Sequence, residues 1–374
     1  MAAMNSALNQ ARRMVVKIGS ALVANTDGQP RQPWLRNLAR DISELRNGGC
    51  EVLLVSSGAI ALGKPRLPEA VLRRLDGKQA AAALGQPLLM SALSSAFEAS
   101  KLSIAQALLT LDDTENRRRW LNARATLNVL LEAGTVPVIN ENDTVATAEI
   151  RYGDNDRLAA RVAQMVSADH LILLSDIDGL YTADPRTNAS ASHIDCVDYI
   201  SPEIEAMASD ADAGGVGSGG MKTKLAAAKI AFAAGCTTII TLGDRDMPVK
   251  ALREGARATW IKPRVTPDTA RRIWLKGHLT PEGSITVDEG AAKAVAEGAS
   301  LLPVGIAGVE GAFDRGAAVA VLSSTGKVLA KGVTAYSASD IRLIAGKRTG
   351  EVEAILGPAR RPAVIHRDDL VIDR

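Results

Sequence analysis

The chain has 374 residues, 47% of them hydrophobic, which is enough for two or three domains with cores of their own. Its formal net charge is +2 and its aromatic content is 3%, so the composition argues against a strongly basic nucleic-acid-binding protein and gives no field that would attract an anionic membrane. The four histidines have no metal-ligand spacing, so no zinc site is expected.

The cysteines and the apolar runs bear on the compartment. Cys50, Cys196 and Cys236 stand at unrelated spacings, which favours unpaired thiols in a reducing compartment. The first residues lack the apolar run of a signal peptide, and we expect no segment long and apolar enough to span a bilayer. The sequence therefore predicts a cytoplasmic protein with no membrane partner.

Short apolar runs alternate with helical patterns along the first two thirds of the chain. Strands are expected at 14–18, 51–56, 104–110, 135–140, 171–175 and 237–241. Helices are expected at 34–47, 78–100, 115–133, 157–166 and 225–234. Because the strands are apolar on both faces, the pattern predicts an α/β fold, a three-layer α/β/α sandwich with a mainly parallel sheet.

Polar residues follow the ends of most of these strands. Since the carboxyl ends of parallel strands meet at one edge of a sheet, ligands of such folds bind there. The residues concerned are Gly19–Ser20, Ser57–Gly58, Asn140–Thr144, Asp176–Gly179 and Gly243–Asp244. We therefore predict a single site at this edge.

Two charged features fit neither a plain strand nor a plain helix. Lys17 lies inside an apolar strand, where a buried amine is costly unless it is paired or points into a site. Asp154, Asn155 and Asp156 precede the helix expected at 157–166. One of the three could serve as the helix N-cap, but only one side chain can occupy that position, so the others can face the site.

A glycine-dense stretch, GGVGSGGMKTK at 214–224, leads into the helix expected at 225–234. Glycines allow backbone amides to turn toward an anion, and the start of a helix and a lysine add positive charge. The stretch therefore indicates a phosphate-binding loop, although a flexible surface loop is the alternative. It has neither the spacing of a P-loop nor a preceding strand that a dinucleotide fingerprint requires.

The pattern changes after residue 263. We expect a catalytic domain at 10–263, a polar linker at 264–278, a small β-rich domain at 279–360 and a C-terminal tail at 361–374. Residues 277–374 contain 11 Lys and Arg against 12 Asp and Glu, a local charge of −1, which argues against an autonomous RNA-binding module.

Several long motifs in one order resemble the amino-acid kinase family, in the branch that acts on glutamate and carries a C-terminal PUA domain. They are VVKIGS at 15–20, LVSSGAIALG at 54–63, KQAAAALGQ at 78–86, INENDTVAT at 139–147, YGDNDRLAA at 152–160, LLSDIDGLYTADPR at 173–186 and GSGGMKTKLAAA at 217–228. The resemblance implies ATP-dependent phosphorylation of the γ-carboxylate of L-glutamate, the first step toward proline. It also implies Mg²⁺ on the ATP, a homo-oligomer and inhibition by proline.

Residue roles follow from the same resemblance. Lys17, Lys224 and Asp156 would be catalytic, with Asp156 orienting the two lysines. Ser57, Asp143 and Asn155 would hold glutamate, with Asp143 facing its ammonium. The expected ATP-binding residues are Lys17, Ser175, Asp176, Ser218, Gly219, Gly220, Met221, Lys222, Thr223 and Lys224.

Two other interpretations stay open at the level of sequence. One is an amino-acid kinase that phosphorylates a different carboxylate, phosphate or carbamate acceptor, since acceptor choice would lie in 57–63 and 140–147. The other is an RNA-binding protein that acts through the PUA-like domain, against which the local charge already argues.

Overall fold

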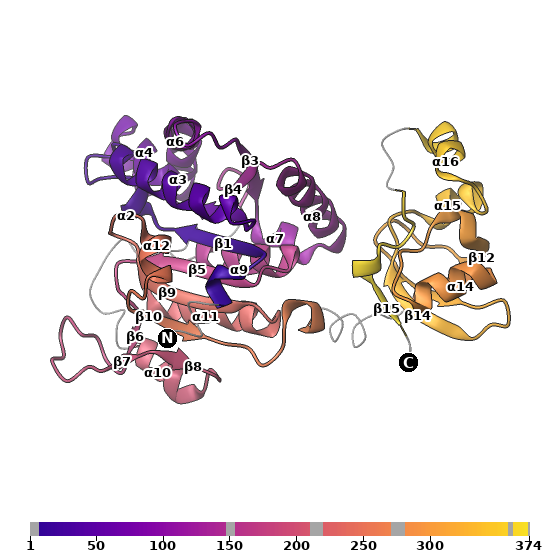
Figure 1. Ribbon diagram of the computed structural model, residues 1–374. Coiled ribbons are helices and arrows are strands. Elements are labelled where there is room, and N and C mark those ends of the chain that lie inside the picture. Colours follow the sequence, from indigo (N-terminus) through magenta and orange to yellow (C-terminus); the bar gives the residue numbers. More distant parts are fainter. Residues whose placement is uncertain (1–6, 147–153, 210–219, 271–280, 358–361, 373–374) are drawn as a thin grey trace. The chain divides into compact units, whose positions relative to one another are not determined.

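The computed structural model describes residues 7–146, 154–209, 220–270, 281–357 and 362–372 (Figure 1). The chain divides into two compact units, residues 1–267 and 268–374. Each unit has its own sheet and its own buried core, so each is described by itself.

The first unit is built on an eight-stranded sheet in the order β3-β4-β2-β1-β5-β9-β10-β8. All neighbours are parallel except β9 and β10, so the expected mainly parallel sheet is confirmed. The strands are β1 Arg13–Ile18, β2 Glu51–Ser56, β3 Ile104–Leu109, β4 Val136–Glu141, β5 His170–Ser175, β8 Cys196–Val197, β9 Thr237–Leu242 and β10 Ala258–Ile261. A separate two-stranded ribbon pairs β6 Leu180–Tyr181 with β7 His193–Ile194.

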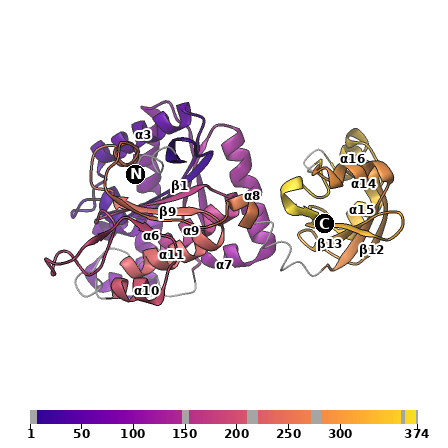
Figure 2. The same ribbon diagram turned by 60° about the horizontal axis from the view of Figure 1, so that its bottom comes forward.

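Helices cover both faces of this sheet, which confirms the three-layer arrangement (Figures 1 and 2). One face carries α2 Ser20–Val23, α3 Gln32–Asn47, α4 Ala59–Gly63, α6 Leu75–Glu98 and α12 Pro248–Arg253, with the short η1 Lys64–Arg66 and α5 Glu69–Leu72 between α4 and α6. The other face carries α7 Leu111–Glu115, α8 Arg117–Glu132, α9 Asp154–Val166, α10 Pro202–Ser209 and α11 Met221–Ala233.

Successive side chains of β1 alternate between the two cores. Met14, Val16 and Ile18 belong to the core under α3 and α6, whereas Val15 belongs to the core under α9 and α11. Since side chains of a strand alternate with a period of two, Lys17 points to the same face as Val15. Lys17 therefore faces α9 and α11, which lie side by side (Figure 2).

Helix α6 packs on α4 through backbone rather than through large side chains. A Cβ atom on Gly85 would lie 1.7 Å from the carbonyl oxygen of Ala59, and one on Gly63 would lie 1.9 Å from that of Ala81. In contrast to the sequence expectation, α6 is the one helix among the described residues that is long and apolar enough to cross a membrane. The buried residues from Leu89 to Phe97 lie in the core that α3 and α4 share.

Three helices differ from the expected bounds in ways that matter for the site. The helix expected to begin at Arg157 begins at Asp154, so Asp154, Asn155 and Asp156 lie in its first turn rather than before it. The helix expected at 115–133 is two helices, because Asn116 ends α7 and its side chain accepts a hydrogen bond from the amide of Arg119 at the start of α8. The helix expected to begin at 225 begins at Met221, with Gly220 as its N-cap. Lys222, Thr223 and Lys224 therefore lie in the first helical turn rather than in the glycine loop.

The second unit is a five-stranded sheet in the order β12-β11-β13-β14-β15, with short helices around one core. Its elements are β11 Gly283–Val287, α14 Glu289–Ala296, η3 Pro303–Gly305, β12 Ile306–Gly311, β13 Ala318–Leu322, β14 Val328–Val333, α15 Ala338–Ile344, α16 Thr349–Leu356, η4 Arg367–Asp369 and β15 Leu370–Ile372. This unit is the strand-rich domain that the sequence predicts.

The prediction of a separate C-terminal tail at 361–374 is wrong. Strand β15 pairs antiparallel with β14, and Val364, Ile365 and Leu370 are buried in the core of the second unit. Apolar side chains in this segment gain burial by completing the sheet, so the domain extends at least to residue 372.

Candidate active site

A buried cluster of opposite charges lies at the carboxyl end of β1. Lys17 Nζ lies 2.6 Å from Asp156 Oδ1, and Lys224 Nζ lies 3.9 Å from Asp156 Oδ2. The exposed fractions of the three residues are 6%, 0% and 4%, respectively. Each comes from a different element, namely β1, α9 and α11, so the fold itself assembles what the sequence separates by more than 200 residues.

The two lysines decide the charge state of the carboxylate. Burial alone would raise the pKa of Asp156, but the positive charges of Lys17 and Lys224 outweigh that effect and hold the pKa below its ordinary value of 3.8. Thr223 also donates a hydrogen bond from Oγ1 to Asp156 Oδ2 at 3.0 Å. Asp156 is therefore ionised at neutral pH and keeps two buried cations close to each other.

The start of α11 supplies the remaining described part of the expected nucleotide loop. Gly220 caps the helix, its carbonyl accepts from Thr223 Oγ1 at 2.8 Å, and Met221 is buried while Lys222 is exposed. Helix N-termini carry unsatisfied amides and a positive dipole end, so this turn suits an anion. Ser218 and Gly219 lie outside the described residues.

Ser175 and Asp176 mark the end of β5 at the same edge of the sheet. Ser175 donates from Oγ to Asp176 Oδ1 at 3.1 Å, and its carbonyl accepts from the amide of Gly243 at 2.7 Å. Asp176 is exposed, and its Oδ2 lies 3.9 Å from Arg186. Their place beside Lys17 on β1 follows from the parallel pairing of β1 and β5.

A neutral hydrogen-bonded group lies next to the charged one. Asn155 donates from Nδ2 to Ser57 Oγ at 3.0 Å and to Asn140 Oδ1 at 3.1 Å. Asn140 in turn donates from Nδ2 to Gln86 Oε1 at 2.8 Å. Because Asn155 and Asp156 are adjacent on α9, the neutral and charged groups share one wall.

The structure adds Asn140 and Gln86 to the residues expected around a glutamate site. Asn140 is 2% exposed at the end of β4, and its place in the 140–144 polar cluster was a usable signal. Gln86 stands on α6 within an Ala- and Leu-rich run that has no local polar pattern. Asp143 lies half-buried in the loop after β4, at the same sheet edge.

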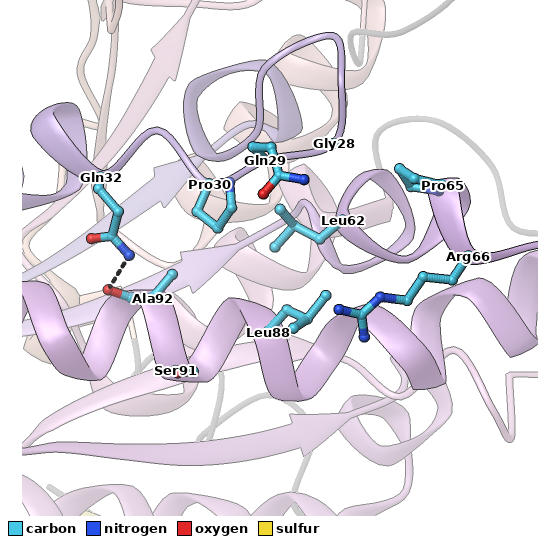
Figure 3. A pocket seen from close by; sticks show the side chains of 10 residues that line it. All are labelled: Gly28, Gln29, Pro30, Gln32, Leu62, Pro65, Arg66, Leu88, Ser91 and Ala92. Carbon is cyan, nitrogen blue, oxygen red and sulfur yellow. Dashed lines mark hydrogen bonds between the residues drawn. The ribbon is translucent and has the colours of Figure 1, made fainter.

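A separate pocket of about 210 Å³ opens on the α6 face of the first unit (Figure 3). The 28–32 segment forms one wall, η1 and the end of α4 form another, and α6 forms the floor. Leu62 and Leu88 face each other across it, with Gln29 and Arg66 at its rim (Figure 3). None of the predicted substrate or nucleotide residues lines this pocket, so it is distinct from the site described above.

The donor set fits a phosphate better than a protein-bound metal. Lys17, Lys224 and the α11 amides are groups that bind phosphate oxygens. Mg²⁺ requires oxygen ligands, and the buried carboxylate of Asp156 is already engaged by two lysines. A Mg²⁺ ion that enters on the phosphates of a nucleotide fits this site, since such ions take few protein ligands.

Together these groups can transfer a phosphoryl group to an anionic acceptor. A carboxylate is a nucleophile without a general base, so the barrier is the repulsion between two anions. Preorganised cations in a water-poor site lower that barrier, because they stabilise charge that develops during transfer. Lys17 and Lys224 are two such buried cations, and the amide of Asn155 bonded to the hydroxyl of Ser57 lies next to them.

Comparison with known proteins gives the chain close relatives. The model of the amino acid kinase family matches residues 12–241, and the model of the PUA domain matches residues 283–356. Glutamate 5-kinase of Paramagnetospirillum magneticum is 55% identical over 369 residues, which cover 98% of this chain and 100% of that protein. Glutamate 5-kinase of Caulobacter vibrioides is 54% identical over 369 residues, 98% of each chain.

More distant similarity extends to solved structures. The UMP kinase from Ureaplasma parvum is 16% identical with a TM-score of 0.46, and the match covers 68% of this chain and 99% of that one. An isopentenyl phosphate kinase is 17% identical with a TM-score of 0.47, over 67% of this chain and 100% of that one.

Proposed function

The chain belongs to the amino acid kinase family, and we propose that it transfers the γ-phosphoryl group of ATP to the γ-carboxylate of L-glutamate, the first step of proline biosynthesis. The activity that the full-length relatives carry in their name supports this reaction. The observation that carries the proposal is the buried Lys17–Asp156–Lys224 cluster, because it is a preformed receptor for a transferring phosphoryl group.

The proposed division of labour follows the geometry. Lys17 and Lys224 bind phosphate oxygens, and Asp156 holds the lysines in place before the nucleotide arrives. Ser175 and Asp176, together with residues 218–224, bind the nucleotide. In the acceptor half of the site, formed by Ser57 and Asn155, Ser57 accepts a hydrogen bond from Asn155. The hydroxyl proton of Ser57 can therefore be donated to a carboxylate of glutamate. Asp143 faces the ammonium of glutamate.

The reaction needs no proton transfer to begin. The γ-carboxylate of glutamate attacks the γ-phosphorus as the bond to the β,γ-bridging oxygen breaks, and ADP leaves with the released electron pair. Mg²⁺, carried on the phosphates, supplies further positive charge to the leaving group. The two lysines neutralise charge on the equatorial oxygens during transfer, which is where removal of a preorganised donor costs most.

An acceptor panel tests the proposed substrate. Purified protein is mixed with Mg·ATP and, in parallel, glutamate, aspartate, N-acetylglutamate or carbamate, and release of ADP is measured. We expect ADP release with glutamate and at most a trace with the others. Faster turnover of another acceptor would instead support a different amino-acid kinase activity for this chain.

We also propose inhibition by proline at the glutamate site. Proline presents an α-carboxylate and a cationic nitrogen, as glutamate does, so groups such as Asp143 and Asn155 suit both ligands. Proline should then raise the apparent KM for glutamate more than it lowers kcat, and substitution of Asn142 or Asp143 should weaken both ligands. Purely non-competitive inhibition against glutamate would contradict shared groups.

The second unit is proposed to be accessory to the chemistry. Every residue assigned a role lies in the first compact unit, residues 1–267, and the PUA-like unit has a core of its own. A chain that ends at Pro267 should fold and keep a kcat near that of the full chain. A folded truncation with no activity would show instead that the second unit is needed.

We further propose that the enzyme is a homo-oligomer and acts in the cytoplasm. Sedimentation would test the oligomeric state, and cell fractionation would test the compartment.

A further inference from the structure

A chain of side-chain amides links α6 to the acceptor half of the site. Gln86 Oε1 accepts from Asn140 Nδ2 at 2.8 Å, Asn140 Oδ1 accepts from Asn155 Nδ2 at 3.1 Å, and Asn155 Nδ2 reaches Ser57 Oγ at 3.0 Å. Three of the four residues come from α6, β4 and α9, and Ser57 directly follows β2. None of the roles assigned above involves Gln86.

The direction of these hydrogen bonds is fixed by a backbone amide. The N–H of Glu141 lies 2.9 Å from Asn140 Oδ1 and can only donate, so the atom it meets must be an oxygen. The other end of the Asn140 amide is therefore NH₂ and needs an acceptor, which Gln86 provides. Asn155 must direct its NH₂ toward Asn140 and Ser57, so its carbonyl oxygen is the end left over.

Within this hydrogen-bonded group of four residues, two buried polar atoms have no hydrogen-bond partner among the described residues, namely Gln86 Nε2 and Asn155 Oδ1. Such atoms cost free energy in the state in which they are unpaired. One is a donor and the other an acceptor. An α-amino acid offers the complement of the Asn155 oxygen, because its ammonium is a donor.

Gln86 is held in a fixed place relative to the acceptor loop. Its neighbour Gly85 is pressed against Ala59, where a Cβ would lie 1.7 Å from the carbonyl oxygen. Ala59 is the first residue of α4 and follows Ser57 and Gly58 directly. Ser57 is therefore connected to Gln86 in two ways. One is the series of hydrogen bonds through Asn155 and Asn140, and the other is the packing of α6 on α4.

We propose that Gln86 is a positioning residue for the amino-acid head group: it holds Asn140 so that Asn155 presents its carbonyl oxygen to the ammonium of the acceptor. The proposal rests on the proposed function. If residue 86 cannot accept a hydrogen bond, the buried NH₂ of Asn140 has no partner, and the Asn140 side chain lowers its free energy by turning toward another group. Asn155 then loses the hydrogen bond that fixes its own orientation.

The test is steady-state kinetics of Gln86→Met and Gln86→Leu in the full-length protein. Both replacements are apolar and suit a helix, and methionine also matches the length of glutamine. Because a hydrogen bond to a charged group is lost, the KM for glutamate should rise about tenfold or more. The KM for ATP should stay at the parent value, and kcat should change less than the KM for glutamate. Gln164→Met is the matched control, because Gln164 is a half-buried glutamine on α9 whose side chain bonds only Arg161 among the described residues.

Glutarate, which is glutamate without its ammonium, separates positioning from general damage. As a competitive inhibitor it should keep its Ki in the Gln86 variants, because it has no ammonium for Asn155 to accept. An unchanged KM for glutamate in a folded Gln86 variant, or a Ki for glutarate that rises as much as that KM, would overturn the proposal. A parent enzyme that does not phosphorylate glutamate would contradict the proposed function instead, and so the two failures are distinct.

Discussion

Asp156 and Asp41 are both fully buried carboxylates of the same unit, yet their surroundings have opposite effects. Asp156 faces Lys17 and Lys224, which hold its pKa below the ordinary value. Asp41, on α3, accepts hydrogen bonds from backbone amides at the start of α12, with Val249 N at 2.6 Å. Burial dominates there and raises the pKa of Asp41 to about 6.

The difference separates a site from a structural contact. Asp41 joins two helices on the outer layer, and a neutral amide could make the same contact. Asp156 is needed as a charge, because two buried lysines near each other repel unless an anion lies between them. A perturbed pKa alone therefore does not distinguish the two carboxylates, whereas the pairing of Asp156 with two buried cations does, and this pairing is what the proposed site rests on.

The largest expected effect comes from the same substitution at the two positions. Asp156→Asn should lower kcat by roughly 10²–10³, equivalent to about 3–4 kcal/mol, because the lysines lose the charge that orients them. Asp41→Asn should leave kcat unchanged, since Asp41 contacts α12 and no residue of the site. Steady-state kinetics of the two variants, with folding checked by circular dichroism, measures the contrast. Equal losses in both would remove the distinction.

A smaller effect concerns stability near Asp41. Because its folded pKa of about 6 is above the ordinary 3.8, the folded state binds the proton more tightly, and the group's contribution to stability falls as pH rises from about 4 to 6. A shift of about two units corresponds to about 3 kcal/mol. Asp41→Asn should lack this fall. Its Tm relative to that of the parent should therefore be higher at pH 7 than at pH 4. A difference in Tm that is the same at both pH values would contradict the raised pKa of Asp41.

The smallest expected effect is a change in unfolding free energy that appears only at acidic pH. Since the folded pKa of Asp156 is below 3.8, its ion pairs stabilise the protein fully above that value, and this stabilisation is lost as pH falls through the folded pKa. The difference in unfolding free energy between the parent and Asp156→Asn should therefore be constant at neutral pH and should narrow below about pH 4. A difference that narrows already between pH 7 and pH 5 would mean that the pKa of Asp156 is raised rather than lowered.

Features that depend on local pattern could be predicted from the sequence. The strand expected at 51–56 is β2, because a strand buried on both faces is a continuous apolar run. Lys17 was visible as a charge within such a run, and it lies in the charged cluster. The C-terminal strand β15 was missed, because its three residues carry too short a pattern and only β14 makes them a strand.

Features that depend on distant contacts could not be predicted. Gln86 stands in a helix with no polar periodicity, and its partner Asn140 lies 54 residues later. The antiparallel strand β10 takes its direction from pairing with β9, which no local residue encodes. Sequence motifs pointed to the edge of the sheet, whereas the choice of individual hydrogen-bond partners depends on how four elements meet.

The central claim is that the site has two parts. Lys17, Asp156 and Lys224 promote phosphoryl transfer, whereas Ser57 and Asn155 hold glutamate. Single-turnover kinetics of Lys224→Ala and Asn155→Ala, at saturating ATP and increasing glutamate, tests this claim most directly. Lys224→Ala should slow the transfer step by roughly 10²–10³ at any glutamate concentration. Asn155→Ala should approach the parent rate once glutamate is raised far enough, because it removes binding rather than charge stabilisation. Equal slowing of transfer in both variants, unrelieved by glutamate, would contradict the separation.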